Sequence, residues 1–328
     1  MTPPLLEIRD LSVSFSHPHG VAHAVRGLDF VMRPGEVHSL VGESGSGKTV
    51  MTHAVLGLLA GKKVEVSGSA KFGDEDLLSL SDEGLRRVRG AQIGMIFQEP
   101  SRYLNPAFTI GNQITEMLRV HQALDRRAAD ARAAQLLELV GLGQDLRVVR
   151  SYAHELSGGM RQRAMIAMAA SCSPALLIAD EPTTALDVTV EKKILELLLE
   201  LKNRLGMSML FISHNLAVVQ EISDRVSVIY MGRIVESGSR TRVFAAPIHP
   251  YTRLLLDAIP DPDKRGQRLA SIPGSVPDAE NVPDGCAFHT RCPFAAEACG
   301  IQEPDLAEYD RGNGEPHLAA CLRIGELE

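Results

Sequence analysis

Long apolar runs are missing from this chain of 328 residues. Crossing a bilayer takes about 20 consecutive apolar residues, and the best candidates, His53–Ala60 and Ile194–Leu201, are short or interrupted by charge. The segment Met1–Glu7 lacks a basic stretch followed by an apolar one, so we expect no signal peptide. The sequence therefore predicts a cytoplasmic protein, which must dock on other chains if it serves a membrane process.

An excess of positive charge is also missing. The formal net charge is −7, so nothing in the balance favours a nucleic-acid backbone as partner. Apolar residues make up 45% and charged residues 23% of the chain, which is ordinary for a soluble globular protein. The length allows one large domain or two modest ones, each with its own core.

Strand and helix patterns alternate along the chain. Leu5–Phe15 alternates apolar and polar residues, as an edge-forming strand would. Val37–Val41 and Ala175–Ala179 are bare apolar segments, typical of strands buried on both faces of a parallel sheet. Glu191–Leu205 has the pattern of an amphipathic helix. Such alternation predicts an α/β fold.

The texture of the sequence divides the chain into regions. Helical spacing dominates from about 101 to 160, so we expect an inserted helical subdomain there. Proline and glycine become frequent beyond Gly238. We therefore predict one domain over 1–240 and a small accessory domain over 241–328.

A glycine-rich loop is expected between the strand Val37–Val41 and an apolar helix that runs to about Leu59. Its sequence, which fits G-x-x-x-x-G-K-[ST] in full, is Gly42-Glu43-Ser44-Gly45-Ser46-Gly47-Lys48-Thr49. Such glycines let backbone N–H groups turn inward around phosphate oxygens. Lys48 would reach the β- and γ-phosphates, and the Thr49 hydroxyl would bind Mg²⁺. The loop therefore predicts a site for ATP and Mg²⁺.

Two carboxylates follow the apolar strand at 176–179. Strand ends at this edge of a parallel sheet are where P-loop folds bind nucleotide. Asp180 would hold the Mg²⁺ shell, directly or through water. Glu181 would act on the attacking water, because a carboxylate bound to Mg²⁺ is a poor proton acceptor.

One further segment, Leu156–Arg163, reads Leu-Ser-Gly-Gly-Met-Arg-Gln-Arg and matches the signature of ABC ATPases. With the motifs above, in that order, the whole chain resembles the ATP-binding subunit of a peptide-type ABC importer, in the dipeptide/oligopeptide/nickel permease group. The resemblance implies a P-loop NTPase core of ABC type. An antiparallel β-subdomain, an inserted α-helical subdomain and a small C-terminal accessory domain would complete the fold.

The resemblance also implies individual roles. Phe15 would stack on adenine, although the family more often has tyrosine there, and Gln98 would sense Mg²⁺ and water. Ser157, Gly158 and Gly159 would contact the γ-phosphate held by the opposite subunit. Asp187 would communicate between the two sites, and His214 would contact the γ-phosphate as a switch. Glu99 and Asn215 depart from the aspartates usual at their positions, but neither change removes a catalytic group.

The tail contains four of the five cysteines, with the spacing C-x5-C-x6-C-x21-C over Cys286, Cys292, Cys299 and Cys321. No paired C-x2–4-C knuckle of the kind typical of zinc sites is present. The resemblance implies a [4Fe–4S] cluster on these four residues; Zn²⁺ and reduced thiols are the alternatives. His249-Pro250-Tyr251, just after the ATPase core, resembles the start of the C-terminal extension of peptide-importer ATPases.

The function implied is ATP hydrolysis that powers import, of di- or oligopeptides first, with nickel, glutathione-like or sugar solutes as alternative cargo. The expected partners are a second ABC ATPase, identical or not, and two transmembrane permeases. A solute-binding protein would act indirectly from outside, and the chain would lie peripherally on the cytoplasmic face of the inner membrane. A soluble ABC mechanoenzyme acting on DNA or ribosomes is the alternative from another class. Intact Lys48, Glu181, Ser157 and His214 disfavour a non-hydrolysing regulator.

Overall fold

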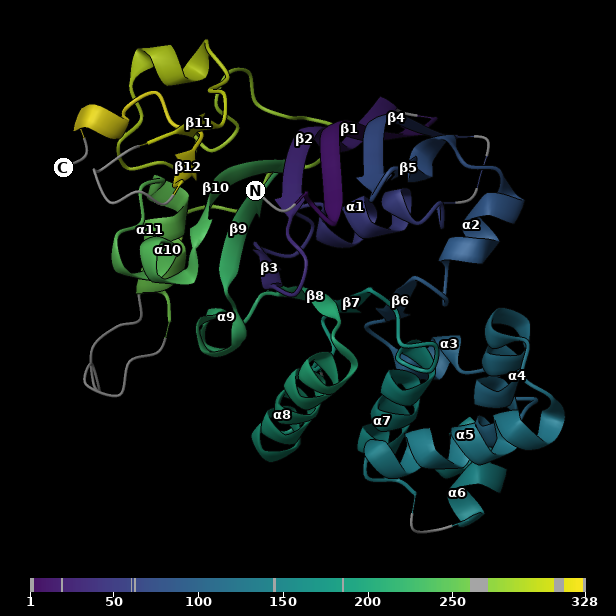
Figure 1. Cartoon of the computed structure of the whole chain (residues 1–328). Helices are drawn as coiled ribbons and strands as arrows, with labels where there is room; N and C mark the ends of the chain where they lie inside the picture. Colours follow the sequence, from purple (N-terminus) through teal and green to yellow (C-terminus); the bar gives the residue numbers. More distant parts are fainter. Residues whose placement is uncertain are drawn as a thin grey trace. The chain divides into compact units, whose positions relative to one another are not determined.

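The computed structural model describes residues 3–18, 20–59, 61, 63–143, 146–184, 186–259, 271–309 and 316–326 (Figure 1). The chain divides into two compact units. One unit combines Met1–Ser79 with Ser213–Glu328, and the other is Leu80–Ile212. Among the described residues, none of the helices has the length and apolar character needed to cross a membrane.

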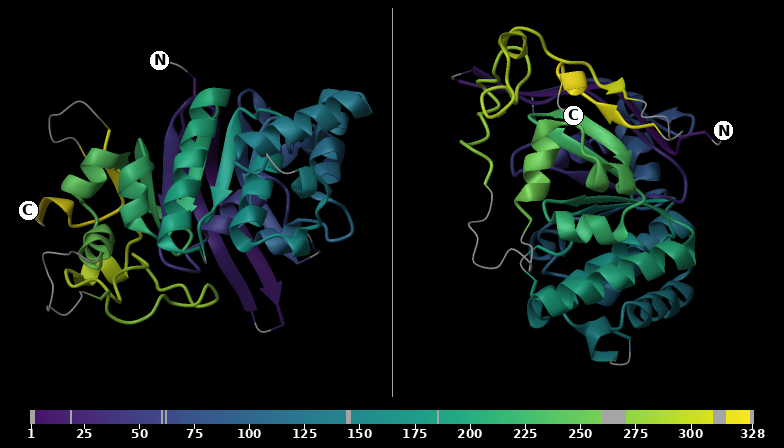
Figure 2. Two further views of the ribbon diagram at one scale, coloured as in Figure 1. Left: turned by 90° about the horizontal axis from the view of Figure 1, so that it is seen from below. Right: turned by 90° about the vertical axis from the view of Figure 1, so that its left-hand side faces the viewer.

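The first unit contains an antiparallel sheet of order β2-β1-β4-β5. Its strands are β1 (Leu6–His17), β2 (Gly20–Met32), β4 (Val64–Phe72) and β5 (Glu75–Asp76). β1 was expected at an edge, but it lies between β2 and β4, with Ile8 opposite both Phe30 and Ala70. The alternation in β1 has another cause, because an antiparallel strand with one face on the core shows the same pattern. Figure 2 shows β1 and β2 side by side in purple.

A second sheet of this unit contains the strand that leads to the glycine-rich loop. Its order is β11 (Ala307–Glu308), β12 (Leu318–Ala319), β10 (Arg233–Ser239), β9 (Arg225–Tyr230) and β3 (Val37–Val41). β3 is buried along its whole length and pairs parallel with β9, which confirms the buried strand predicted at 37–41. The helices of the unit are α1 (Lys48–Val55), α9 (Leu216–Ile222), α10 (Arg240–Ala245) and α11 (Pro250–Asp257).

The second unit contains three parallel strands in the order β8-β7-β6. They are β6 (Ile93–Ile96), β7 (Leu176–Asp180) and β8 (Ser208–Ser213), whose last residue belongs to the first unit. The helices are α2 (Asp82–Val88), α3 (Pro100–Tyr103), α4 (Ile110–Gln122), α5 (Arg126–Leu139), α6 (Leu146–Arg150), α7 (Gly158–Ala169) and α8 (Val188–Leu205). Helices α3 to α6 occupy the region where the sequence predicts a helical insertion.

The described residues beyond α11 in the first unit have little regular structure. Between 271 and 306 the backbone forms turns and one short 3-10 helix at Glu297–Gly300, drawn in yellow-green and yellow in Figure 2. Contacts between side chains, rather than backbone ladders, therefore fix the extension to the rest of its unit. Tyr230 of β9, Tyr251 of α11 and Phe288 pack together, with ring centroids 4.7 to 5.2 Å apart.

Candidate active site

The glycine-rich loop follows β3 and turns tightly against its neighbours. A Cβ atom on Gly42 would lie 2.3 Å from the carbonyl oxygen of Ile229, so only glycine fits there. Gly47 has φ +103°, and a Cβ atom on it would lie 2.5 Å from the carbonyl oxygen of Ala24. Both the conformation and the space therefore require glycine at the two ends of the loop.

Lys48 opens helix α1 and bends back over the loop. Its side chain is buried, and Nζ donates hydrogen bonds to the carbonyl oxygens of Gly42, at 2.9 Å, and Glu43, at 3.0 Å. Ser44 and Gly45 are exposed, so the loop has an open side. The N-cap residue Gly47 carries no side chain to cap the first turn of α1, and a helix start is a place where backbone N–H groups can bind an anion.

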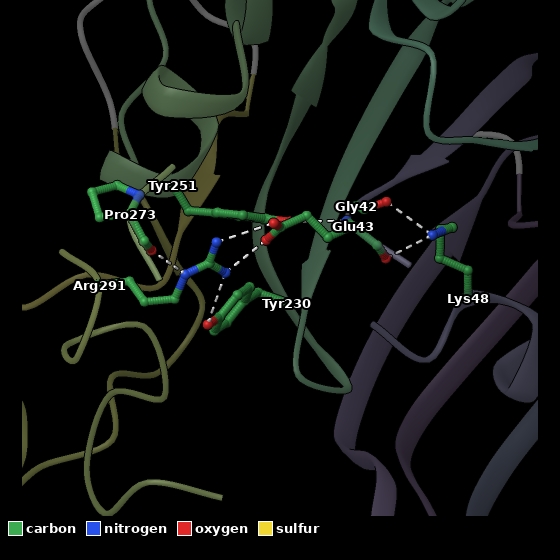
Figure 3. Close-up of polar contacts among 7 residues, drawn as sticks. All are labelled: Gly42, Glu43, Lys48, Tyr230, Tyr251, Pro273 and Arg291. Atoms are coloured by element: carbon green, nitrogen blue, oxygen red, sulfur yellow. Dashed lines mark hydrogen bonds and ion pairs between the residues drawn. The ribbon is translucent and has the colours of Figure 1, made fainter. Parts of the chain in front are cut away.

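Glu43 joins this loop to the C-terminal extension (Figure 3). Its carboxylate accepts two hydrogen bonds from the Arg291 guanidinium, at 2.8 and 3.1 Å. Its backbone N–H donates to the Tyr251 hydroxyl at 2.9 Å. The hydrogen bond to Glu43 raises the pKa of Arg291, and burial raises that of Tyr251. Sequence motifs did not reveal Arg291, although the tripeptide that contains Tyr251 drew attention to that residue.

The two predicted carboxylates follow one another at the end of β7. Asp180 is the last residue of the strand and is buried. Glu181 adopts a left-handed backbone with φ +46°, which is rare for a residue other than glycine. Its Oε2 accepts hydrogen bonds from Gln98 Nε2 and from Thr184 Oγ1, both at 2.9 Å. The structure thus brings together Gln98 and Glu181, which are 83 positions apart. Thr184 was not predicted to contact Glu181.

The segment around Gln98 is held from two sides. The rings of Phe97 and Tyr103 are stacked, with centroids 3.8 Å apart. The backbone N–H of Phe97 contacts Sδ of Met165, on helix α7, at 3.4 Å. Gln98 is therefore linked through its neighbour to the helix that begins with the signature sequence.

That signature forms the exposed start of α7. Ser157 is the N-cap, and its Oγ accepts a hydrogen bond from the N–H of Met160 at 3.3 Å. Gly158 is exposed, and a Cβ atom on it would meet nothing within 4 Å. A helix N-terminus of this kind favours an anion, since its first N–H groups lack partners within the helix.

The remaining predicted residues lie at the ends of other elements. Asp187 is the N-cap of α8 and accepts a hydrogen bond from the N–H of Val190 at 3.0 Å. His214 is exposed between β8 and α9. Phe15 is half-buried in β1, opposite Ala22 of β2.

The prediction of an iron–sulfur cluster in the tail is wrong. The residues predicted to bind it, Cys286, Cys292, Cys299 and Cys321, line one cavity together with His289. However, the described residues contain no group of three or more His, Cys, Asp and Glu side chains able to hold a metal ion, which also argues against the zinc alternative there. All the cysteines are free thiols. Burial raises the pKa of Cys286 to about 11 and also raises that of Cys292 and Cys321.

The residues of the loop and the strand ends fit a nucleotide. The close approach of the backbone at Gly42 and Gly47 fixes the conformation of the loop, and Lys48 places a buried cation within it. A hydroxyl at Thr49 and a carboxylate at Asp180 are oxygen donors of the kind that Mg²⁺ takes together with phosphate oxygens. The chemistry of each of these groups, taken within its own unit, therefore suits ATP with Mg²⁺.

Two family models match the sequence. Residues 25–184 match the model described as ABC transporter. Residues 235–299 match the model described as oligopeptide/dipeptide transporter, C-terminal region. A putative peptide import ATP-binding protein of Brucella melitensis is 48% identical, over 99% of this chain and 98% of that protein. The oligopeptide transport ATP-binding protein AppD of Bacillus subtilis is 45% identical, over 94% of each chain.

Solved structures show the same fold. The ATP-binding cassette MJ0796, determined as a dimer bound to ADP and Pi, aligns with a TM-score of 0.64 and 24% identity, over 72% of this chain and 98% of that one. CbiO1 of Clostridium perfringens aligns with a TM-score of 0.62 and 26% identity, over 74% and 91%. The fold and the matched family models define an ATPase of the ABC type. Since its relatives align over nearly their whole length, this chain belongs to the ABC transporter ATPases of the oligopeptide/dipeptide transporter family. These matches confirm the predicted fold class, ATPase activity and family.

Proposed function

We propose that this chain hydrolyses ATP to power the import of di- or oligopeptides through an ABC transporter. The proposal rests on relatives that are 45–48% identical over nearly the whole chain and are named for peptide import or oligopeptide transport. The match of residues 235–299 to an oligopeptide/dipeptide transporter region supports it. No finding favours nickel, glutathione-like or sugar cargo, or action on DNA or ribosomes.

Nucleotide binding is assigned to the loop at 42–49. Its N–H groups and Lys48 would bind the phosphates, and Phe15 would stack on the adenine. Thr49, Asp180 and Gln98 would hold Mg²⁺, which supplies charge stabilisation at the phosphates when it is bound. In support, Lys48 is buried against the carbonyl groups of the loop, and Asp180 is buried at the end of β7.

Hydrolysis is assigned to Glu181. Its carboxylate would orient the attacking water and accept its proton, while His214 would contact the γ-phosphate. The hydrogen bonds from Gln98 and Thr184 to Oε2 support this assignment, because they hold the carboxylate in one orientation.

The active form is proposed to be a head-to-tail dimer, with an identical or a similar partner. Ser157, Gly158 and Gly159 would bind the γ-phosphate held by the opposite subunit, and Asp187 would link the two sites. The exposed start of α7 supports this, because it is an anion-binding helix end with open space at Gly158. The dimeric ADP-bound state of the MJ0796 cassette also supports it.

Two transmembrane permeases are the proposed docking partners, at the cytoplasmic face of the inner membrane. Exposed apolar side chains on the helical insertion support a protein partner there: Tyr103 is 45%, Phe108 51% and Val120 69% exposed. A solute-binding protein outside would select the peptide and act on this chain only through the permeases.

The dimer is tested by mixing two inactive variants. Lys48→Ala disables a chain's own loop, and Ser157→Arg disables the surface offered to its neighbour. Each variant alone should hydrolyse ATP at least ~100-fold more slowly, since a lost phosphate contact is worth several kcal/mol. Their mixture should recover part of the parental rate, because one site of the mixed dimer has both parental halves. Phosphate release against protein concentration measures this.

Loss of ATP binding by isolated Ser157→Arg would contradict the head-to-tail arrangement. So would parental turnover by a lone copy at vanishing concentration. The cargo is tested in the transporter reconstituted with its permeases and binding protein, where di- or oligopeptides should stimulate ATP turnover. Stimulation by nickel or sugars, with none by peptides, would overturn the peptide assignment.

A further inference from the structure

The C-terminal extension contacts the glycine-rich loop through one buried cation. Arg291 is 7% exposed and directs two of its nitrogens at the Glu43 carboxylate, at 2.8 and 3.1 Å (Figure 3). Its Nε donates to the carbonyl oxygen of Pro273 at 2.8 Å, and Nη1 also reaches the Tyr230 hydroxyl at 3.4 Å. All these groups belong to the same compact unit. The bidentate geometry fixes the direction of the glutamate side chain as well as its charge.

The same loop residue is held by its backbone. The peptide group that joins Gly42 to Glu43 donates its N–H to the Tyr251 hydroxyl at 2.9 Å and accepts a bond on its C=O from Lys48 Nζ at 2.9 Å. A trans peptide group is planar, with N–H and C=O pointing in opposite directions. Tyr251 and Lys48 therefore hold one rigid plane from its two sides, and rotation of that plane would break both hydrogen bonds.

The side that comes from the extension is well supported. Tyr251 is fully buried and packs against Tyr230 and Phe288. The Glu43 carbonyl oxygen accepts both from Lys48 Nζ, at 3.0 Å, and from the N–H of Ser46, at 3.2 Å. Tilting residue 43 would therefore move the lysine and the loop backbone together.

We propose that Tyr251 and Arg291 are positioning residues of the phosphate loop, through which the C-terminal extension sets the affinity of the loop for the phosphates of ATP. The inference rests on the proposed role of residues 42–49 in nucleotide binding. Neither side chain touches nucleotide in this scheme. They orient the Gly42–Glu43 peptide, which orients Lys48.

The test measures binding of Mg²⁺-free ATP to the full-length chain by calorimetry, and then KM and kcat with Mg²⁺. Arg291→Gln and Tyr251→Phe should each raise the Kd and the KM about tenfold, the effect of one lost hydrogen bond of this strength. The kcat should change less than twofold, because Glu181 and its partners are untouched. Arg291→Lys should restore only part of the affinity, since lysine lacks the planar fork.

A matched control breaks another contact of the extension. Glu303→Gln removes ion pairs to Arg26, at 2.9 Å, and Arg233, at 2.7 Å, without touching the loop, so the Kd should stay within twofold of the parent. Glu43→Gln should weaken binding like Arg291→Gln, and the double variant should be no weaker than either single one, because both changes remove the same contact.

The inference is overturned if Tyr251→Phe and Arg291→Gln keep the parental thermal midpoint and bind ATP with the parental Kd. It is equally overturned if Glu303→Gln weakens binding as much as they do, because the extension would then act only through general stability. Lys48→Ala separates the two proposals. If Lys48→Ala binds ATP with the parental Kd, the proposed nucleotide site is contradicted. If Lys48→Ala loses ATP binding while Arg291→Gln and Tyr251→Phe keep the parental Kd, only the positioning role is contradicted.

Discussion

The ATPase core and the C-terminal extension are stabilised in different ways. In the core, β3 and β7 are buried along their whole length, and the predicted loop at 42–49 and the predicted carboxylates lie at or just beyond the ends of these strands. In the extension, the described strands β11 and β12 have two residues each, and buried polar groups make the connections. Glu236 of β10, which lies just before the extension, makes the clearest of these connections. It accepts hydrogen bonds from the N–H groups of Ile248 and His249, both at 2.9 Å, and pairs with His317 at 2.8 Å.

The comparison shows where a substitution should change activity without unfolding the protein, and where it should lower stability without acting on the active site. In the core, the side chains at strand ends are carried by buried strands whose stability does not depend on those side chains. Side chains in the extension are themselves the support. Substitutions in the core site should therefore alter rate, whereas substitutions at the buried pairs should alter stability.

The largest effect is expected for Glu181→Gln. Losing the proton acceptor should lower kcat roughly 1000-fold, about 4 kcal/mol in activation free energy. ATP should still bind, and the dimer should accumulate, because bound nucleotide would stabilise it. Phosphate release, calorimetry and light scattering measure the three quantities. Glu196→Gln, an exposed residue of α8, is the control for the same chemical change. Parental turnover by Glu181→Gln would show that another group is the base.

A smaller effect, on stability, is expected for Glu236→Ala. Removing this fully buried carboxylate leaves two backbone N–H groups and His317 without their hydrogen-bond partner, which should lower the free energy of unfolding by about 3 kcal/mol. Urea denaturation should show the loss, and proteolysis should begin in the extension. Glu200→Ala on the exposed face of α8 should change stability by less than about 0.5 kcal/mol. Equal losses in both variants would mean that the buried carboxylate contributes nothing special.

The smallest effect is a pH dependence from His249. Burial lowers its pKa from 6.5 to about 4, and its Nδ1 must stay unprotonated to accept a hydrogen bond from the N–H of Tyr251. Between pH 6.5 and pH 4 the unfolded chain therefore binds a proton at His249 that the folded chain does not bind. The contribution of neutral His249 to stability is complete above pH 6.5 and is lost as the pH falls toward 4. At pH 5.5 the loss should be about 1.4 kcal/mol.

Thermal denaturation between pH 7 and pH 5 measures this dependence. His249→Asn keeps an acceptor at the N-cap position and removes the titration, so its stability should depend less on pH. His154→Asn, at an exposed histidine, should keep the parental pH profile. An unchanged profile in His249→Asn would assign the dependence to other groups.

The sequence predicted the core well because its signals are local. The strand at 37–41 has the predicted bounds, and the loop that follows it needs glycine where the motif has glycine. Patterns were weaker for β4, which has several exposed positions and no clear alternation, so it was not predicted. The interior position of β1 was also missed, since alternation reports burial of one face and says nothing about neighbours.

The contacts of the extension lay beyond such signals. Arg291 and Glu43 are 248 positions apart, and Glu236 and His317 are 81 apart, so only the tertiary fold brings them together. The cysteine spacing suggested that the thiols gather, and they do line one cavity. Spacing carries no information about their protonation or their ligand geometry, and the metal prediction failed on that point.

Glu181 has one more consequence, through its backbone. A left-handed conformation at a non-glycine residue costs of order 1–3 kcal/mol, and here the N–H of Glu181 bonds to the carbonyl oxygen of Ile212 while its own carbonyl oxygen accepts from the N–H of Thr184. The backbone conformation and its hydrogen bonds therefore set the direction of the carboxylate without help from a ligand. In the proposed role of Glu181, each turnover begins with that carboxylate already oriented, and the free-energy cost of orienting it is met once, when the polypeptide folds.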